Sequence, residues 1–155
     1  MITKQDIHNG YNNLKKCIDV YIKLHNVAFE ASSDAPSTYS SMRESMDSRG
    51  CYVVYNGGDH GLLGEEYNIK FRAIHDHGHY VNVLSFKFDD ERRLSDIQAT
   101  ELALIAWNNL GLTTWEVYVV KRIVQTEIAG QIDYYEKNKK YVDDQKEFVY
   151  GMFRV

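Results

Sequence analysis

The chain has a single proline, Pro36, among its 155 residues. Proline interrupts helices more strongly than any other residue, so its near absence leaves long stretches free to be helical. Apolar residues recur with a helical period along most of the sequence, and residues 51–55 are the best strand. We therefore expect a mainly α fold, a single-domain bundle of four to five helices with a minor β element near residues 51–55. The length suits one domain, residues 1–155, with one core.

The first helix is expected to follow Thr3. This residue supplies a side-chain acceptor for a helix N-terminus, and Asp6 places an acid in the first turn. The apolar stripe of the helix consists of Ile7, Tyr11, Leu14, Ile18, Tyr21, Ile22 and Phe29. His25 falls in the middle of this stripe. A histidine on an apolar face is usually a satisfied core residue, so His25 is an outlying candidate for a functional site.

The next part of the chain combines a loop, a short helix and a strand. Residues 30–38 carry the small polar residues and the proline of a loop. A short helix is expected over residues 38–49, with Gly50 in the left-handed position after its end. The strand 51–55 follows, bounded by Asn-Gly-Gly-Asp. The run 80–88 either pairs with this strand or continues the helix before it, because its pattern fits both.

The densest group of histidines lies in a helix expected over residues 65–79. His75 and His79 are i and i+4, so their rings project from the same side of the helix, at the edge of its apolar face. Asp76 lies about 100° further round, near the rim of any site that the two rings form. Arg72 lies near the His75 side. Helical zinc sites use this histidine spacing.

The following helix carries a glutamate at the centre of its apolar stripe. Residues 89–93 read as a charged linker, and Ser95 with Gln98 then forms a capping box for a helix that ends at Gly111. Its stripe consists of Leu94, Ile97, Leu104 and Ile105. Glu101 sits in this stripe where the pattern calls for leucine.

The longest helix repeats this feature. Thr113 or Thr114 caps its N-terminus, Glu127 sits at the centre of its apolar face, and Gln131 follows one turn later. An unpaired carboxylate in an apolar environment costs several kcal/mol, so such a group becomes protonated, pairs with a cation or binds a metal.

Side chains on facing helices of a bundle can converge into a metal site. The expected ligands come from three helices and are His75, His79, Glu101 and Glu127. The residues expected at the rim are Arg72, Asp76 and Gln131. The alternative is a structural network of Arg–Glu or His–Glu pairs, which would satisfy both carboxylates without a metal and without chemistry.

The composition of the chain excludes some classes of binding partner and location. A net charge of −4 and interleaved acids and bases give no global attraction to a phosphate backbone, so nucleic acid is disfavoured as the primary ligand. Cys17 and Cys51 follow no C-x-x-C spacing, and the N-terminus lacks the apolar run of a signal peptide. A cytoplasmic location is expected. No stretch approaches the eighteen apolar residues of a membrane span, so no membrane association is expected.

Two parts of the sequence resemble known families, and both include the histidine-rich residues 75–79. Residues 73–79, Ala-Ile-His-Asp-His-Gly-His, resemble the HD-x-GH core of HD-domain phosphohydrolases. Members of that family bind divalent metal through His and Asp and hydrolyse phosphate esters. They also need an upstream histidine, for which His60 is the nearby choice, and a later aspartate, for which no residue on an apolar face is available.

The second resemblance covers roughly residues 67–150. The order FRAxHDxxH, an acid, ExxGQxxYY and DQxxFV is similar to a family of small bacteriophage-encoded proteins. This resemblance implies a phage origin, with the host cytoplasm as location, and a shared site, but no particular reaction. Its recurring positions are His75, Asp76, His79, Glu127 and Gln131.

Two functions of different classes follow. The first is a small metal-dependent hydrolase of a phosphate-containing nucleotide, with Zn, Mn or Fe as the divalent ion and with Asp76 and Glu127 as catalytic carboxylates. The second is a phage host-takeover or anti-defence protein that binds and inhibits a host protein. In the second case the His/Glu network only holds the fold, and the binding surface is the tyrosine-rich C-terminus from residue 134 to 153. The sequence leaves the oligomeric state open.

Overall fold

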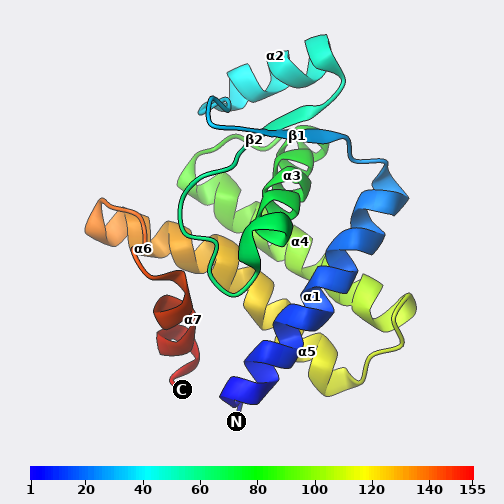
Figure 1. The fold of residues 1–155 in the computed structure, drawn as a ribbon, viewed down its shortest axis with the longest axis vertical. Coiled ribbons are helices and arrows are strands. Elements are labelled where there is room, and N and C mark those ends of the chain that lie inside the picture. Colours follow the sequence, from blue (N-terminus) through cyan, green and yellow to red (C-terminus); the bar gives the residue numbers. More distant parts are fainter.

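Helices dominate the computed structural model, which describes residues 1–155 (Figure 1). The elements in chain order are α1 (Lys4–His25), β1 (Phe29–Ser32), α2 (Tyr39–Arg49), β2 (Tyr52–Tyr55), α3 (Gly64–Asn82), α4 (Phe88–Asn108), α5 (Thr114–Gln125), the π-helical segment η1 (Thr126–Gly130), α6 (Gln131–Asn138) and α7 (Gln145–Phe153). α5, η1 and α6 follow one another without a break. The predicted mainly α fold with a minor β element is confirmed, and α7 is a helix that the sequence pattern did not indicate.

The predicted caps of three helices are confirmed. Thr3 and Asp6 form a capping box at the start of α1, and Thr113 with Glu116 forms another at the start of α5. α2 ends at Gly50, whose φ of 71° is the left-handed conformation expected there. Local hydrogen bonding of short side chains therefore fixes where these helices begin and end.

The β element is a two-stranded parallel sheet. β2 lies where a strand was predicted, but its partner is β1, with Phe29 opposite Tyr52 and Ser32 opposite Tyr55. The prediction of a loop over residues 30–38 is therefore wrong for residues 30–32. The run 80–88 forms no strand, because α3 continues to Asn82 and α4 begins at Phe88. Figure 1 shows α2 and the sheet together at one end of the molecule, beyond α3.

α4 begins seven residues before the predicted capping box at Ser95. Its first turn contains Asp89, Asp90 and Glu91, and acids at this position are favourable beside the positive end of the helix dipole. The predicted charged linker is therefore helical, and Ser95 lies buried inside the helix. The buried face consists of Glu91, Leu94, Ser95, Gln98, Ala99, Leu102, Ile105 and Ala106. Leu104 lies outside this face, with 54% of its surface exposed, which corrects the predicted stripe.

The core lies between α1, α4 and α5, which pack mainly against one another. α3 crosses α4 closely at Gly78. A Cβ atom at this position would lie 2.6 Å from Gln98 Nε2 and 2.8 Å from Leu94 Cδ1, too close for either side chain to stay in place. Gly78 therefore lets the C-terminal half of α3 lie against the N-terminal half of α4.

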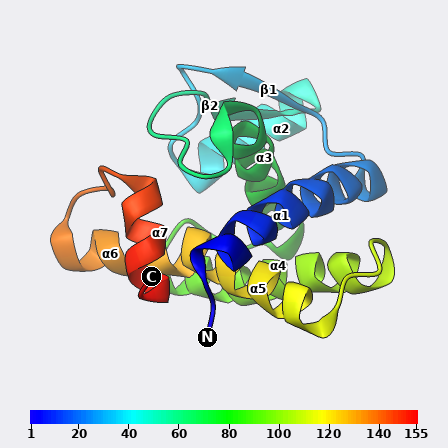
Figure 2. The same cartoon turned by 60° about the horizontal axis from the view of Figure 1, so that its bottom comes forward.

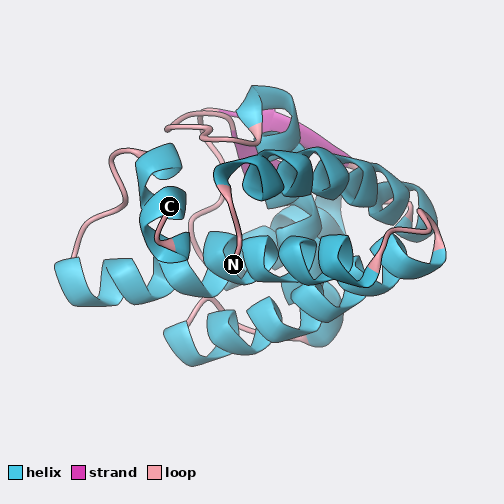
Figure 3. Cartoon of the chain, turned by 90° about the horizontal axis from the view of Figure 1, so that it is seen from below, coloured by secondary structure: helices cyan, strands magenta, loops and turns pink.

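The two chain termini lie on the same side of the molecule (Figure 2). The side chains of His8 in α1 and Tyr150 in α7 are joined by a hydrogen bond of 2.8 Å. Seen from below, helices fill most of the molecule and the strands lie at its edge (Figure 3). No helix combines the length and the hydrophobicity that crossing a lipid bilayer requires.

Candidate metal site and its pocket

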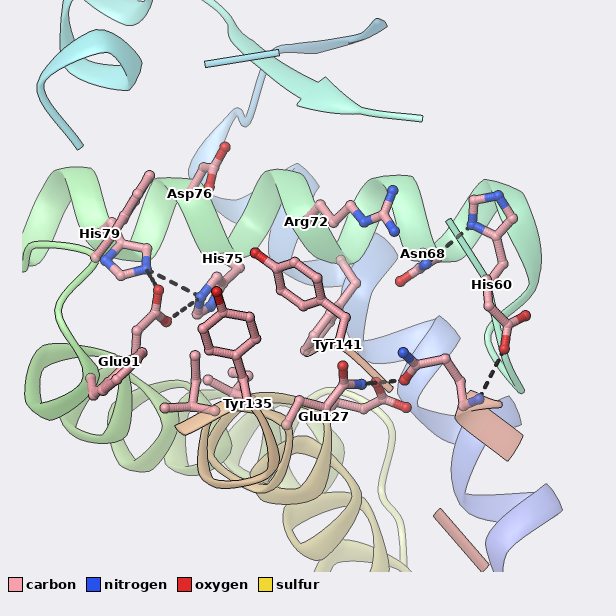
Figure 4. Close-up of a pocket in the computed structure, with 18 of the residues that line it drawn as sticks. His60, Asn68, Arg72, His75, Asp76, His79, Glu91, Glu127, Tyr135 and Tyr141 are labelled. Carbon is pink, nitrogen blue, oxygen red and sulfur yellow. Dashed lines mark hydrogen bonds and ion pairs between the residues drawn. The ribbon is translucent and has the colours of Figure 1, made fainter. Parts of the chain in front are cut away.

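Two histidines and one glutamate meet where α3 crosses α4 (Figure 4). His75 Nε2 lies 2.9 Å from one carboxylate oxygen of Glu91, and His79 Nε2 lies 3.2 Å from the other. The two Nε2 atoms are 3.2 Å apart. His79 is fully buried and Glu91 is 8% exposed. The three side chains form a buried group with the composition and spacing of a metal-binding site, because each offers a ligand atom within 4.8 Å of the others.

The far nitrogen of each ring is held by a group that fixes its proton. His79 Nδ1 lies 2.9 Å from the carbonyl oxygen of Leu84, and a carbonyl can only accept, so Nδ1 donates. Gln98 Nε2 donates to the carbonyl of Ile74 at 2.7 Å, which turns Gln98 Oε1 toward His75. His75 Nδ1 therefore donates to this oxygen, at 2.8 Å. Both Nε2 atoms consequently present lone pairs to Glu91 when the rings are neutral.

Three acceptors thus converge with no donor among them, so a proton or a metal cation must separate them. In the metal-free protein a proton has to lie between the Nε2 atoms and Glu91. Burial disfavours the charged His75 ring, but the hydrogen bond and the charge of Glu91 outweigh burial and raise the pKa of His75. Burial likewise disfavours the Glu91 carboxylate, yet hydrogen bonds from His75 and His79 lower the pKa of Glu91 to about 2. Partners that orient the far nitrogen of a metal-binding histidine are typical of metal sites.

The cluster opens into a pocket of about 460 Å³. The predicted site residues that line this pocket are Arg72, His75, Asp76, His79, Glu127 and Gln131. In Figure 4 the cluster lies at one end of α3, Arg72 lies near the middle, and His60 and Asn68 lie at the other end. His60 Nδ1 is 3.1 Å from Asn68 Nδ2, so His60 lines the same pocket but does not join the cluster.

Glu127 is not a member of the metal cluster, contrary to the prediction. Its two carboxylate oxygens accept hydrogen bonds from the hydroxyl of Tyr11 and from Gln131 Nε2, the latter at 3.1 Å. Burial raises the pKa of Glu127, although these two hydrogen bonds lower it. Gln131 Nε2 also donates to Gln145 Oε1 at 2.5 Å. Glu127 lies in η1, and π-helical turns inside α-helices are frequent at functional sites.

Glu101 does not line the pocket, and its predicted role as a ligand is corrected. Burial raises the pKa of Glu101, while the charge of His25 and a hydrogen bond from Tyr21 lower it. His25 itself is exposed at the end of α1, where its ring stacks on Tyr21 with centroids 4.2 Å apart. Both residues therefore belong to a separate polar cluster beside α1.

Asp76 lines the pocket, and its carboxylate leaves α3 on a different side from the two histidine rings (Figure 4). Burial raises the pKa of Asp76 to about 6, against the effect of the nearby His75 and His79 charges. No hydrogen bond to its carboxylate is formed within the chain. Arg72, one turn earlier, donates through Nη1 to the carbonyl oxygens of Tyr55 and Gly57. Both residues therefore line the pocket, outside the His75–His79–Glu91 cluster.

Glu91 is the member of the cluster that the sequence pattern does not indicate. The pattern predicts a charged linker here, because three consecutive acids are typical of a solvated turn when the start of the helix is placed at Ser95. The signal that could have identified it is the polar set Glu91, Ser95 and Gln98 at i, i+4 and i+7, which share one helix face. The polar or aromatic residues of the pocket that were not predicted as site residues also include Ser37, Asp59, Asn68, Phe86, Phe88, Tyr135, Tyr141 and Gln145.

Comparison of the chain with protein-family models, with curated proteins and with solved structures finds no match. The resemblances to phage proteins and to HD-domain phosphohydrolases stay predictions, and the functional assignment rests on the pocket and its side chains.

Proposed function

We propose that the protein is a metal-dependent hydrolase in which His75, His79 and Glu91 hold a divalent ion. The observation that carries this proposal is the convergence of three acceptors whose donors are already committed elsewhere. Three protein ligands of the type His, His and carboxylate are typical of catalytic metal sites, because they leave a coordination position for water or substrate. Zn, Mn and Fe all suit these ligands.

A divalent ion held here would lower the pKa of a bound water molecule and polarise a phosphoryl oxygen. In the hydrolysis, the water oxygen forms a bond to phosphorus and the ester P–O bond breaks. The attacking water gives up one proton and the leaving alkoxide takes up one, and carboxyl groups of the pocket can carry this proton from one to the other. We assign the role of proton acceptor to Asp76, acting through a water molecule, because its carboxylate leaves α3 on a different side from the two histidine rings. Glu127 suits this role less well, because both of its oxygens already accept hydrogen bonds.

The substrate class that we propose is a phosphate-containing nucleotide. A volume of about 460 Å³ lies within the usual range for small-molecule sites. Aromatic rings suitable for stacking on a base line the pocket and are those of Phe86, Phe88, Tyr135 and Tyr141. Tyr135 and Tyr141 lie against each other, with ring centroids 4.7 Å apart, and Tyr141 is 78% exposed. Tyr141 therefore has a free ring surface at the mouth of the pocket.

The metal content of purified protein tests the first part of the proposal. We expect near-stoichiometric Zn, Mn or Fe in the wild type by elemental analysis, and at least a tenfold lower content in Glu91→Gln. Glu101→Gln is the matched control, because it changes the same residue type on the same helix outside the pocket. A wild-type protein that retains no metal after supplementation, or a Glu91→Gln variant that retains as much as the control, would refute the site.

Hydrolysis tests the second part. The metal-loaded protein should release phosphate or nucleoside from a panel of nucleoside mono-, di- and triphosphates and p-nitrophenyl phosphates, and chelation should abolish this release. A protein that holds its metal but hydrolyses no member of the panel would contradict the hydrolase assignment. It would favour the binding protein that inhibits a host factor, which a pull-down with the Glu91→Gln variant would then detect.

A further inference from the structure

The guanidinium group of Arg72 has no carboxylate partner. Its Nη1 donates to the carbonyl oxygens of Tyr55, at 2.5 Å, and Gly57, at 2.9 Å. Its carbon lies 5.6 Å from the centre of the Tyr55 ring. All of these contacts hold the group in place, but none neutralises it. Arg72 is partly buried, and this burial lowers the pKa of its guanidinium group.

A partly buried cation is normally paired with an anion. Acids line the same pocket, namely Asp59, Asp76, Glu91 and Glu127, yet none forms an ion pair with Arg72. Asp76 is the closest in sequence, one turn further along α3, but no ion pair joins it to Arg72. Arg72 is also the only arginine of the pocket, and no lysine lines it. The positive charge therefore lacks a partner from this chain.

The free edge of the guanidinium suits a tetrahedral oxyanion. Because Nη1 is committed to two carbonyls, the remaining N–H groups are on Nε and Nη2, and these lie side by side as a fork. Such a fork binds two oxygens of a phosphate in a bidentate manner, which lysine cannot do. Gly58 lies beside this edge, since a Cβ atom there would be 3.6 Å from Nη2.

The position of Arg72 relates this edge to the metal cluster. Arg72, His75 and His79 stand at i, i+3 and i+7 on α3, so they follow one another along a single stripe that faces the pocket. Side chains three residues apart on a helix are neighbours, with Cβ atoms about 5–6 Å apart, so Arg72 is next to the cluster along α3.

We propose that Arg72 is the residue that binds the phosphate group of the substrate, beside the His75–His79–Glu91 cluster. This inference rests on the proposed function for the meaning of the bound phosphate, but the binding itself does not require the metal. The carbonyl groups of Tyr55, at the end of β2, and of Gly57 preorganise the guanidinium, so little freedom is lost when the anion binds. The pocket would therefore select phosphorylated substrates over their uncharged analogues.

Binding of inorganic phosphate to the chelator-treated, metal-free protein tests this inference, by calorimetry at low and high salt. Arg72→Met should weaken binding at least tenfold, and Arg72→Lys should weaken it as well, because lysine keeps the charge but loses the fork. Arg122→Met is the control, since Arg122 is exposed and outside the pocket. If circular dichroism shows that Arg72→Met is unfolded, the phosphate affinity of Arg72→Lys still tests the assignment.

Wild-type protein that binds no phosphate, or an Arg72→Lys variant that binds it as tightly as the wild type, would overturn the assignment. Acetate at the same concentration separates recognition of phosphate from recognition of any anion, and equal affinity for both would also overturn it. The metal content of Arg72→Lys should equal that of the wild type. Loss of phosphate binding with intact metal content thus isolates Arg72, whereas an unoccupied metal site with intact phosphate binding would refute only the proposed hydrolase.

Discussion

Two hydrogen bonds join His79 and Leu84 across the turn that ends α3. The amide nitrogen of Leu84 donates to the carbonyl oxygen of His79 at 3.1 Å, and the carbonyl oxygen of Leu84 accepts from the ring of His79 at 2.9 Å. The turn that ends α3 therefore also fixes the orientation of a candidate metal ligand. It does so through Val83, which adopts φ 54°, a left-handed conformation that is unfavourable for a β-branched residue.

Val83→Gly should stabilise the protein, because glycine adopts the left-handed conformation without steric cost. Val83 is 69% exposed, so little packing is lost. We expect a gain of about 1 kcal/mol in the free energy of unfolding, measured by urea denaturation. Val81→Gly is the matched control, because Val81 is 54% exposed but lies within α3, where glycine should cost about 1 kcal/mol. Equal effects of both substitutions would show that the turn carries no strain.

The contribution of the Glu91–His75 pair to the stability of the metal-free protein should be largest between about pH 4.5 and 6.5. Glu91 has a lowered pKa of about 2, so its contribution is complete above its unfolded pKa near 4.5 and is lost as the pH falls toward 2. His75 has a raised pKa, so its contribution is complete below its unfolded value near 6.5 and is lost as the pH rises through the folded value. Thermal melts of the wild type and of Glu91→Gln across pH 3–9 in chelator should differ most within this window. An unchanged profile in the variant would contradict the ion pair.

The helical parts of the fold could be predicted because their signals are local. The caps at Thr3, Thr38 and Thr113 depend on hydrogen bonds within four residues, and all three helices begin there. The partner of β2 could not be predicted in this way. β1 is short and lies in a segment of small polar residues, and α2 separates it from β2 in the sequence. Only the tertiary packing therefore identifies it as the partner of β2.

The candidate site was predictable on α3 but not on α4, for a physical reason. His75 and His79 share a face by helical spacing alone, whatever the neighbouring elements do. The choice of carboxylate depends on the phase of α4 and on its contact with α3 at Gly78. A pattern that takes only apolar residues to mark the core predicts a solvated surface for Glu91, Ser95 and Gln98, although all three face inward. The pattern therefore selected Glu101 instead of Glu91.

Tyr11→Phe should destabilise the protein by about 2 kcal/mol. The Tyr11 hydroxyl donates to the half-buried Glu127 carboxylate, and a hydrogen bond to a charged group contributes about 1.5–3 kcal/mol. The substitution leaves the ring and its packing in place. Tyr67→Phe is the control, because Tyr67 donates to the exposed Asp19, so its loss should change the free energy of unfolding by less than about 0.5 kcal/mol. Denaturation of both variants at neutral pH compares them directly, and similar values would contradict a specific role for the buried pair.

Asp76→Asn should leave the metal in place and slow the hydrolysis. The substitution keeps the shape of the side chain but removes its ability to accept a proton. The loss of a general base typically lowers the rate about 100- to 10,000-fold, so we expect kcat to fall about 100-fold or more. Metal content should equal that of the wild type, because Asp76 does not belong to the cluster. Glu127→Gln, measured in the same assay, should lower kcat less than Asp76→Asn does, since the Glu127 carboxylate is occupied by Tyr11 and Gln131. The reverse order of the two variants would transfer the role of proton acceptor to Glu127.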